Sequence, residues 1–290
     1  METVVDELVQ LLVMFPAPVL AGLAVGAVCS LLGVFVILKR VVFIGMTLSE
    51  VAACGIAAGL VLSVNPFVCA CALTTLAVAA LAYPFESGRI PRDAVLGVVF
   101  VLASAVGILL VSKSGFGLAE VKSLLYGDLI LASWRDLAVV LAVLAPVAVY
   151  LFAFFRPTLC TFLDREMAKS MGLRVVIWEY GFFFALGLAV SAASKITGAI
   201  LIFCYVVVAP SAALLLSKRL GVVMLLSATV ACVSTLAGLY LSFTHDLPTN
   251  QVIAAVACVV FAGAACWRLV QSLRVPGNRK SETAPAVRGE

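Results

Sequence analysis

Charged residues are scarce in this sequence. Of its 290 residues 12% are charged and 64% are hydrophobic, whereas soluble proteins average about 25% charged and about 45–50% apolar residues. The mean hydropathy is +1.21. This composition excludes an ordinary soluble domain, and the net charge of +4 gives no indication of a nucleic-acid partner. The sequence predicts an all-α polytopic membrane protein in contact with lipid. Each of its membrane spans needs about 20 apolar residues, so the chain length limits the number of spans.

Basic residues are missing from the N-terminal region. The first Lys or Arg is Lys39, and the opening residues include the acidic Glu2, Asp6 and Glu7. A cleaved signal peptide requires a basic segment before its apolar stretch. We therefore expect the whole chain to be mature protein.

Catalytic motifs are also lacking. There is no H-E-x-x-H, no G-x-S-x-G and no G-x-x-x-x-G-K-[ST], and the chain has one histidine. These absences argue against a zinc protease, a serine hydrolase and a phosphate-binding loop. Nine cysteines without a C-x-x-C pair are best interpreted as small apolar residues. We expect no enzyme activity and no permanently bound cofactor, so any ATPase that drives transport must be another chain.

The apolar runs predict about nine spans, with eight as the alternative. They lie near 17–38, 46–63, 67–84, 94–112, 134–155, 174–194, 197–216, 221–243 and 250–270. With the N-terminus outside, only Lys113, Lys122, Arg135 and Lys195 face outward, which leaves 15 of the 19 basic residues inside. Because inner loops of membrane proteins are enriched in Lys and Arg, the N-terminus is predicted outside and the C-terminus inside. We expect one transmembrane domain over residues 1–272 and a disordered cytoplasmic tail over 273–290.

Two connections have helical character. Residues 117–132 carry acidic and basic side chains at helical apolar spacing, which suits a short helix on the outer face. Between spans five and six, residues 159–172 predict a polar helix of about three turns that ends at Gly172. Such an inner helix is either an inert surface linker or a docking element for a cytoplasmic partner.

Glu50 lies near the middle of the second apolar run. A charged side chain at that depth costs about 2.5–3.5 kcal/mol on insertion scales, so an intramembrane carboxylate is a functional candidate. Two structural alternatives are a protonated glutamate bonded to a neighbouring helix, or a side chain that reaches toward the inner interface. Met46 and Cys54 share the Glu50 face at four-residue spacing, and Gly55 and Gly59 form a G-x-x-x-G pattern for close helix packing.

The histidine, His245, precedes Asp246 at the predicted outer end of the eighth run. A His-Asp pair in a loop is more often a solvated turn than a metal site, because two ligands do not close a coordination sphere. Its position at the mouth of the protein makes the pair a secondary candidate.

Several segments, taken in order, resemble one family over roughly residues 15–272. These are "GVFVILKRVVFIGMTLSEVAACGIAAG", "LLYGDLILAS", "FLDREMAKSMGL", "TGAILIFCYVVVAPSAALLLSKR" and "DLPTNQV". Together they resemble the permease subunits of bacterial ABC-type importers for zinc, manganese and iron, the ABC-3 family. The third segment is similar to the family's docking motif at Asp164, Glu166, Ala168 and Gly172.

The resemblance implies a permease of the bacterial cytoplasmic (inner) membrane. It would pair with a second permease, identical or different, around a central pathway and dock ABC ATPase subunits through the inner helix. It would receive a divalent manganese, zinc or iron ion from an extracytoplasmic metal-binding protein. A proton-coupled secondary transporter that titrates Glu50 is the alternative, and such a carrier has no need of the inner helix.

The departures from the family pattern fall where the metal chemistry is expected. Met46 replaces the usual aspartate after glycine, Glu50 replaces the usual histidine after Ser49, and Asn250 replaces a glycine. We expect Met46, Ser49 and Glu50, with His245 and Asp246, along the metal pathway. Carboxylate favours harder ions and thioether favours softer ones, so this ligand set leaves the metal open.

Overall fold

The computed structural model describes residues 14–82, 91–113, 127 and 129–274. This part of the chain is helical and contains no strand. The α-helices, in chain order, are α2 (Pro16–Leu38), α3 (Ile44–Val61), α4 (Pro66–Ala82), α5 (Arg92–Lys113), α7 (Trp134–Ala153), α8 (Phe155–Leu163), α9 (Arg165–Ser170), α10 (Val175–Phe203), α11 (Ala209–Leu216), α12 (Leu220–His245) and α13 (Thr249–Arg274). A short 3-10 helix, η1 (Leu129–Leu131), precedes α7, and a π-helix, η2 (Cys204–Val208), joins α10 to α11.

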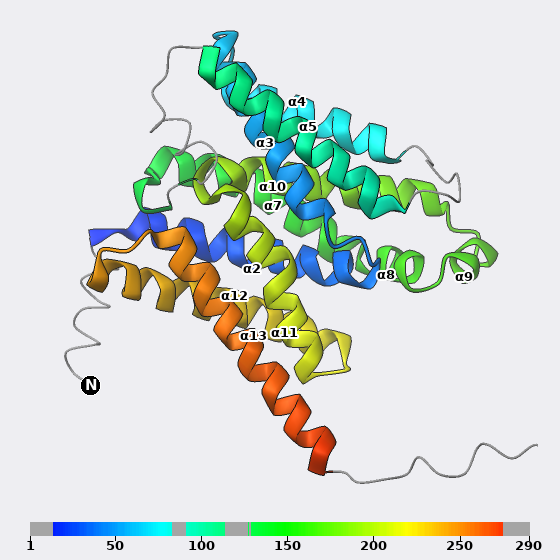
Figure 1. Cartoon of the computed structure of the whole chain (residues 1–290). Helices are drawn as coiled ribbons and strands as arrows, with labels where there is room; N and C mark the ends of the chain where they lie inside the picture. Colours follow the sequence, from blue (N-terminus) through cyan, green and yellow to red (C-terminus); the bar gives the residue numbers. More distant parts are fainter. Residues whose placement is uncertain (1–13, 83–90, 114–126, 128, 275–290) are drawn as a thin grey trace, which may run out of the picture.

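Helix α10 lies between two groups of helices. On one side it packs against α3 and α4, and α3 also packs against α5; on the other side α2, α11, α12 and α13 pack together. Figure 1 shows the α3–α5 group above α10 and the α11–α13 group below it. Helix α10 also contacts α2 and α13, so it touches both groups.

Seven helical segments are long and apolar enough to cross a membrane, and α4 is a shorter apolar helix. One of the seven, Val175–Leu216, has 42 residues and would be about 63 Å long as a straight helix, twice the ~30 Å hydrocarbon core. It is not straight, because Gly198 has φ 67° and ψ 172°. The predicted runs 174–194 and 197–216 are divided at residues 195–196, just before this break. The count of nine spans and the outside N-terminus stay predictions.

The centre of the molecule is built around α2 and η2. Gly33 of α2 faces the backbone of Val206, where an added Cβ would lie 2.1 Å from the carbonyl oxygen. Tyr205, which is fully buried, shares a hydrogen bond of 2.6 Å with Thr235 of α12. The backbone contact with Gly33 and the Tyr205–Thr235 hydrogen bond thus hold the π-helix between α2 and α12.

The prediction of a single inner helix over 159–172 is wrong. The chain forms α8 and α9, which are separated at Asp164 by an extended backbone conformation (φ −145°, ψ 106°). The Asp164 side chain accepts hydrogen bonds from the amides of Glu166 and Met167, so it caps a new helix instead of continuing the old one. The predicted end does occur at Gly172, which has φ 77° after the last turn of α9.

Two other predicted segments fall largely outside the described residues. Of the outer helix predicted over 117–132, the described part contains Gly127, with a positive φ, and η1, in which Leu129 is fully buried. At the C-terminus α13 extends to Arg274, one residue beyond the predicted start of the tail at 273. Residues 275–290, where most of that tail falls, lie outside the described residues.

Candidate functional site

Glu50 lies on α3, where three other helices surround it. Its side chain is 6% exposed, and α3 packs on α4, α5 and α10. Ser104 of α5 is placed to offer the carboxylate a hydrogen bond. A buried carboxylate in a membrane protein needs such a partner because hydrocarbon offers none.

Hydroxyl groups from neighbouring helices gather around the same stretch of α3. The Ser49 and Ser194 hydroxyl oxygens are 3.3 Å apart, and Ser194 also donates to the Ser49 carbonyl oxygen at 3.3 Å. Thr47 donates to the carbonyl of Leu96 on α5 at 3.2 Å. These bonds fix the turn of α3 just before Glu50 against α5 and α10.

Sequence analysis missed the α10 hydroxyls. Ser191, Ser194 and Thr197 follow one another at three-residue spacing, which places them on one face of a helix. The structure pairs Ser191 with Thr74 of α4, and it pairs Ser194 with α3. The regular spacing of hydroxyl residues in an apolar run is the signal that could have found them.

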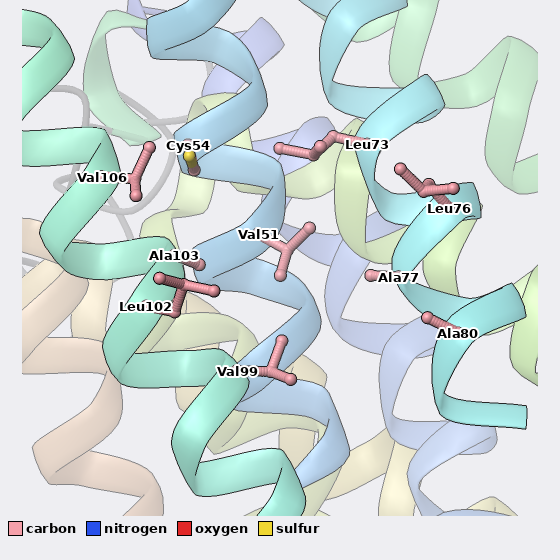
Figure 2. Close-up of a pocket in the computed structure, with 10 residues that line it drawn as sticks. All are labelled: Val51, Cys54, Leu73, Leu76, Ala77, Ala80, Val99, Leu102, Ala103 and Val106. Carbon is pink, nitrogen blue, oxygen red and sulfur yellow. The ribbon is translucent and has the colours of Figure 1, made fainter. Parts of the chain in front are cut away.

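A cavity of about 320 Å³ lies between α3, α4 and α5. Figure 2 shows apolar side chains from all three helices around it, with the Cys54 sulfur as the one atom among the drawn side chains that is not carbon. Val51 and Cys54 come from α3, and Glu50 is not among the lining residues. The cavity is therefore an apolar space beside the Glu50 stretch of α3.

The two sulfur groups flank Glu50 along α3. Met46 is half-buried one turn before it, and Cys54 is 6% exposed one turn after it. In the part of the chain that the structure describes, no three His, Cys, Asp or Glu side chains come close enough to hold a metal ion together. Glu50 and Met46 thus offer one oxygen and one thioether donor on the same helix.

Gly55 and Gly59 lie where α3 meets α4. An added Cβ on Gly55 would be 2.6 Å from the Ala70 Cα, and one on Gly59 would be 2.7 Å from the Pro66 Cα. The two helix backbones are in direct contact at both positions. Close packing here places α4 against the C-terminal half of the Glu50 helix, as the G-x-x-x-G pattern favours.

His245 and Asp246 lie at the end of α12. Both are exposed, and Asp246 has a left-handed conformation with φ 50° that terminates the helix. Helix α12 packs on α2, α11 and α13, whereas the Glu50 helix packs on α4, α5 and α10. The two sets of predicted pathway residues therefore belong to different groups of helices.

The predicted docking residues lie in and around the short helix α9. Ala168 is fully buried, while Glu166 is 82% exposed at its side chain and pairs with Lys169 at 2.8 Å. With Asp164 as its cap and Gly172 as its end, α9 presents a short charged surface on a buried alanine. Such a surface suits contact with another protein.

Membrane-length helices around a buried carboxylate and an exposed charged turn define a polytopic membrane protein of the permease class. The model of the ABC 3 transport family matches residues 10–268, so the chain belongs to this family. Its multi-pass location in the cytoplasmic membrane, as predicted from the sequence, follows from the family and from the seven candidate spans.

Known proteins agree with this assignment. The chain is 28% identical to the manganese transport system membrane protein MntC of Halalkalibacterium halodurans, over 83% of each chain. It is 30% identical to the chelated iron transport system membrane protein YfeC of Yersinia pestis, over 82% of this chain and 80% of that protein. The solved structure of PsaBC from Streptococcus pneumoniae in complex with Fab covers 93% of this chain and 100% of its own, with a TM-score of 0.83 at 23% identity. That likeness shows the ABC permease fold.

Proposed function

We propose that this chain is the membrane permease subunit of an ATP-driven importer for a divalent transition-metal ion, manganese, iron or zinc. The observation that carries the proposal is the match to the ABC 3 transport family over residues 10–268, and the buried Glu50 carboxylate on α3 is the candidate ion contact. The names of the relatives, which specify manganese and chelated iron, support the class of cargo. Carboxylate oxygen is a ligand that suits manganese and iron.

Glu50 and Met46 act, in this proposal, as transient contacts on the ion pathway. One carboxylate and one thioether leave most of a metal coordination sphere unfilled. A second permease, identical to this chain or different from it, would supply further ligands where the two subunits meet. Ser49, His245 and Asp246 are proposed as further pathway residues, with the last two at the outer mouth.

The end of the molecule that carries α8 and α9 is proposed to face the cytoplasm. The C-terminal end of α2, the start of α10 and both short helices lie at this end (Figure 1). It carries Lys39, Arg165 and Lys169, as the enrichment of basic residues on the inner side requires. An ABC ATPase would bind Asp164, Glu166, Ala168 and Gly172 here, and an extracytoplasmic metal-binding protein would deliver the ion at the opposite end.

Metal uptake by the whole complex tests the proposal. Permease, ATPase and binding protein are reconstituted in phosphatidylethanolamine and phosphatidylglycerol vesicles, and uptake of Mn²⁺, Fe²⁺ and Zn²⁺ is measured with and without ATP. We expect ATP-dependent uptake that Glu50→Gln abolishes while the complex still assembles, because the variant removes the charge and keeps the size. Val51→Ala is the matched control, since Val51 is its equally buried neighbour (4% exposed) and lines the apolar cavity.

Two results would overturn the proposal. Normal uptake by Glu50→Gln would remove this carboxylate from the pathway. Uptake that persists without the ATPase and collapses with a protonophore would instead identify a proton-coupled secondary transporter.

A further inference from the structure

Glu179 joins three elements at the end of the molecule that carries the short helices. It lies in the second turn of α10 and accepts a hydrogen bond from the Lys39 ammonium, at the end of α2, through its Oε1. Its other oxygen, Oε2, is 4.0 Å from Arg165 Nη2, at the start of α9. Each carboxylate oxygen thus faces a cation from a different element.

This ion pair is largely removed from water. The Lys39 and Glu179 side chains are each 14% exposed. The Lys39 Nζ also lies 5.2 Å from the centre of the Phe162 ring on α8, in a cation–π arrangement. Attraction between opposite charges is stronger and less screened by salt away from bulk water, so this contact links α2 and α10 even at high ionic strength.

Aromatic rings extend the same connection. Phe162 of α8 contacts Phe182 of α10 with ring centres 4.9 Å apart, and Phe35 of α2 contacts both rings at 6.3 and 5.7 Å. The ring planes of Phe162 and Phe182 are 79° apart, which is the edge-to-face geometry that aromatic pairs favour. Helices α8 and α9 are therefore attached to α2 and α10 by packing as well as by charge.

Helix α10 links this end to the Glu50 region. Its backbone is helical from Glu179 to Ser194, ahead of the break at Gly198, a distance of about 22 Å at 1.5 Å per residue. Ser194 hydrogen-bonds both the hydroxyl and the carbonyl of Ser49, the residue before Glu50. A displacement of the start of α10 along its axis would reach α3 at the residue next to the carboxylate.

We propose that Glu179 is a positioning residue that couples the α8–α9 segment to the ion pathway. It ties Arg165 and Lys39 to α10, so that movement of the docked ATPase is passed along α10 to Ser49 and Glu50. This inference rests on the proposed function, because it requires an ATPase on α9. Lys39, Arg165 and Glu179, which lie outside the proposed metal pathway, would thus take part in transport.

The number of ions transported per ATP hydrolysed tests this role. The reconstituted complex of permease, ATPase and binding protein is used, with Mn²⁺ uptake and phosphate release measured on the same vesicles. We expect Glu179→Gln to keep ATPase binding and ATP hydrolysis while the ratio of ions to ATP falls by about fivefold or more. Glu179→Asp keeps a carboxylate between Lys39 and Arg165 and should hold the ratio to within about twofold of the wild type.

Asp136→Asn is the matched control. It removes the 2.7 Å ion pair between Asp136 of α7 and Lys195, which lies on α10 near the Gly198 break, far along the helix from Glu179. A variant that merely weakens an α10 ion pair should leave the ratio unchanged. If Glu179→Gln acted only by destabilising α10, Asp136→Asn would lower the ratio of ions to ATP by the same factor. Equal falls in the two variants would therefore overturn the inference.

The remaining outcomes are also decisive. An unchanged ratio in Glu179→Gln, or a fall that only follows lost assembly and that is equally large in Glu179→Asp, contradicts the coupling role. Where Glu179→Gln fails to assemble, Arg165→Gln removes the α9 contact with Glu179 and keeps the Lys39 pair, and an unchanged ratio in that variant contradicts the role as well. Absence of ATP-driven uptake in the wild type overturns the proposed function and this inference together, whereas the other results bear on the inference alone.

Discussion

Gly33→Ala should strongly destabilise the fold, because α2 touches the π-helix through its backbone at this position. An added Cβ would lie 2.1 Å from the Val206 carbonyl oxygen and 2.7 and 2.8 Å from its carbonyl carbon and Cα. Ordinary contact needs about 3.5 Å, so α2 and η2 must separate by more than about 1 Å. Overpacking costs about 1–3 kcal/mol or more, and the better helix propensity of alanine returns at most about 1 kcal/mol. We expect a net loss of about 2 kcal/mol.

Thermal unfolding of the purified permease in detergent, followed by circular dichroism, measures this loss. A loss of about 2 kcal/mol corresponds to a Tm lowered by about 4 °C or more. Gly263→Ala is the control, since a Cβ there has no atom within 4 Å, and its Tm should stay level or rise. If Gly33→Ala unfolds at the same temperature as Gly263→Ala, the contact between the α2 and η2 backbones is refuted.

Three further substitutions test other parts of the structure. Tyr205→Phe should lower stability by about 1–2 kcal/mol, seen as a lower Tm, because it leaves the buried Thr235 hydroxyl without this partner. Asp164→Ala should cost α9 about 0.5–2 kcal/mol, seen as faster amide hydrogen exchange over residues 165–170, and unchanged exchange would contradict the cap. Gly198→Ala forces a side chain into a backbone region that is essentially restricted to glycine, at about 1–3 kcal/mol. Its Tm should fall below that of Gly263→Ala, and equal values would contradict the break in α10.

The sequence predicted the membrane class and the helical fold because composition and apolar run length reflect the cost of placing polar groups in hydrocarbon. It also separated two runs near the break in α10, since the Lys195 charge and Gly198 interrupt the apolar pattern there. It did not predict the split between α8 and α9. This polar segment lacks the apolar periodicity that would show where one helix ends and the next begins. Asp164 is a favourable first residue for a helix, but in the middle of a segment that favours helix throughout it does not stand out.

The candidate site was predictable for residues that differ in kind from their surroundings. Glu50 stands out in an apolar run, whereas Ser104 and Ser194 are common residues of membrane helices whose importance comes from pairing across helices. The Lys39–Glu179 contact joins residues 140 positions apart in the sequence. No local pattern contains such a pair, because it depends on how α2 and α10 pack.

Asn250, one of the three departures from the family pattern, has a structural explanation that the other two lack. It is buried, and its side-chain amide donates to the Thr197 carbonyl oxygen at 3.0 Å, next to the Gly198 break in α10. A helix that breaks there leaves carbonyl groups without their usual amide partners, and a buried carbonyl without a partner costs about 1–3 kcal/mol. A glycine at 250 has no side chain to supply this bond. The asparagine therefore stabilises the break from α13. Met46 and Glu50 instead change the side chains on α3 that we propose as ion contacts.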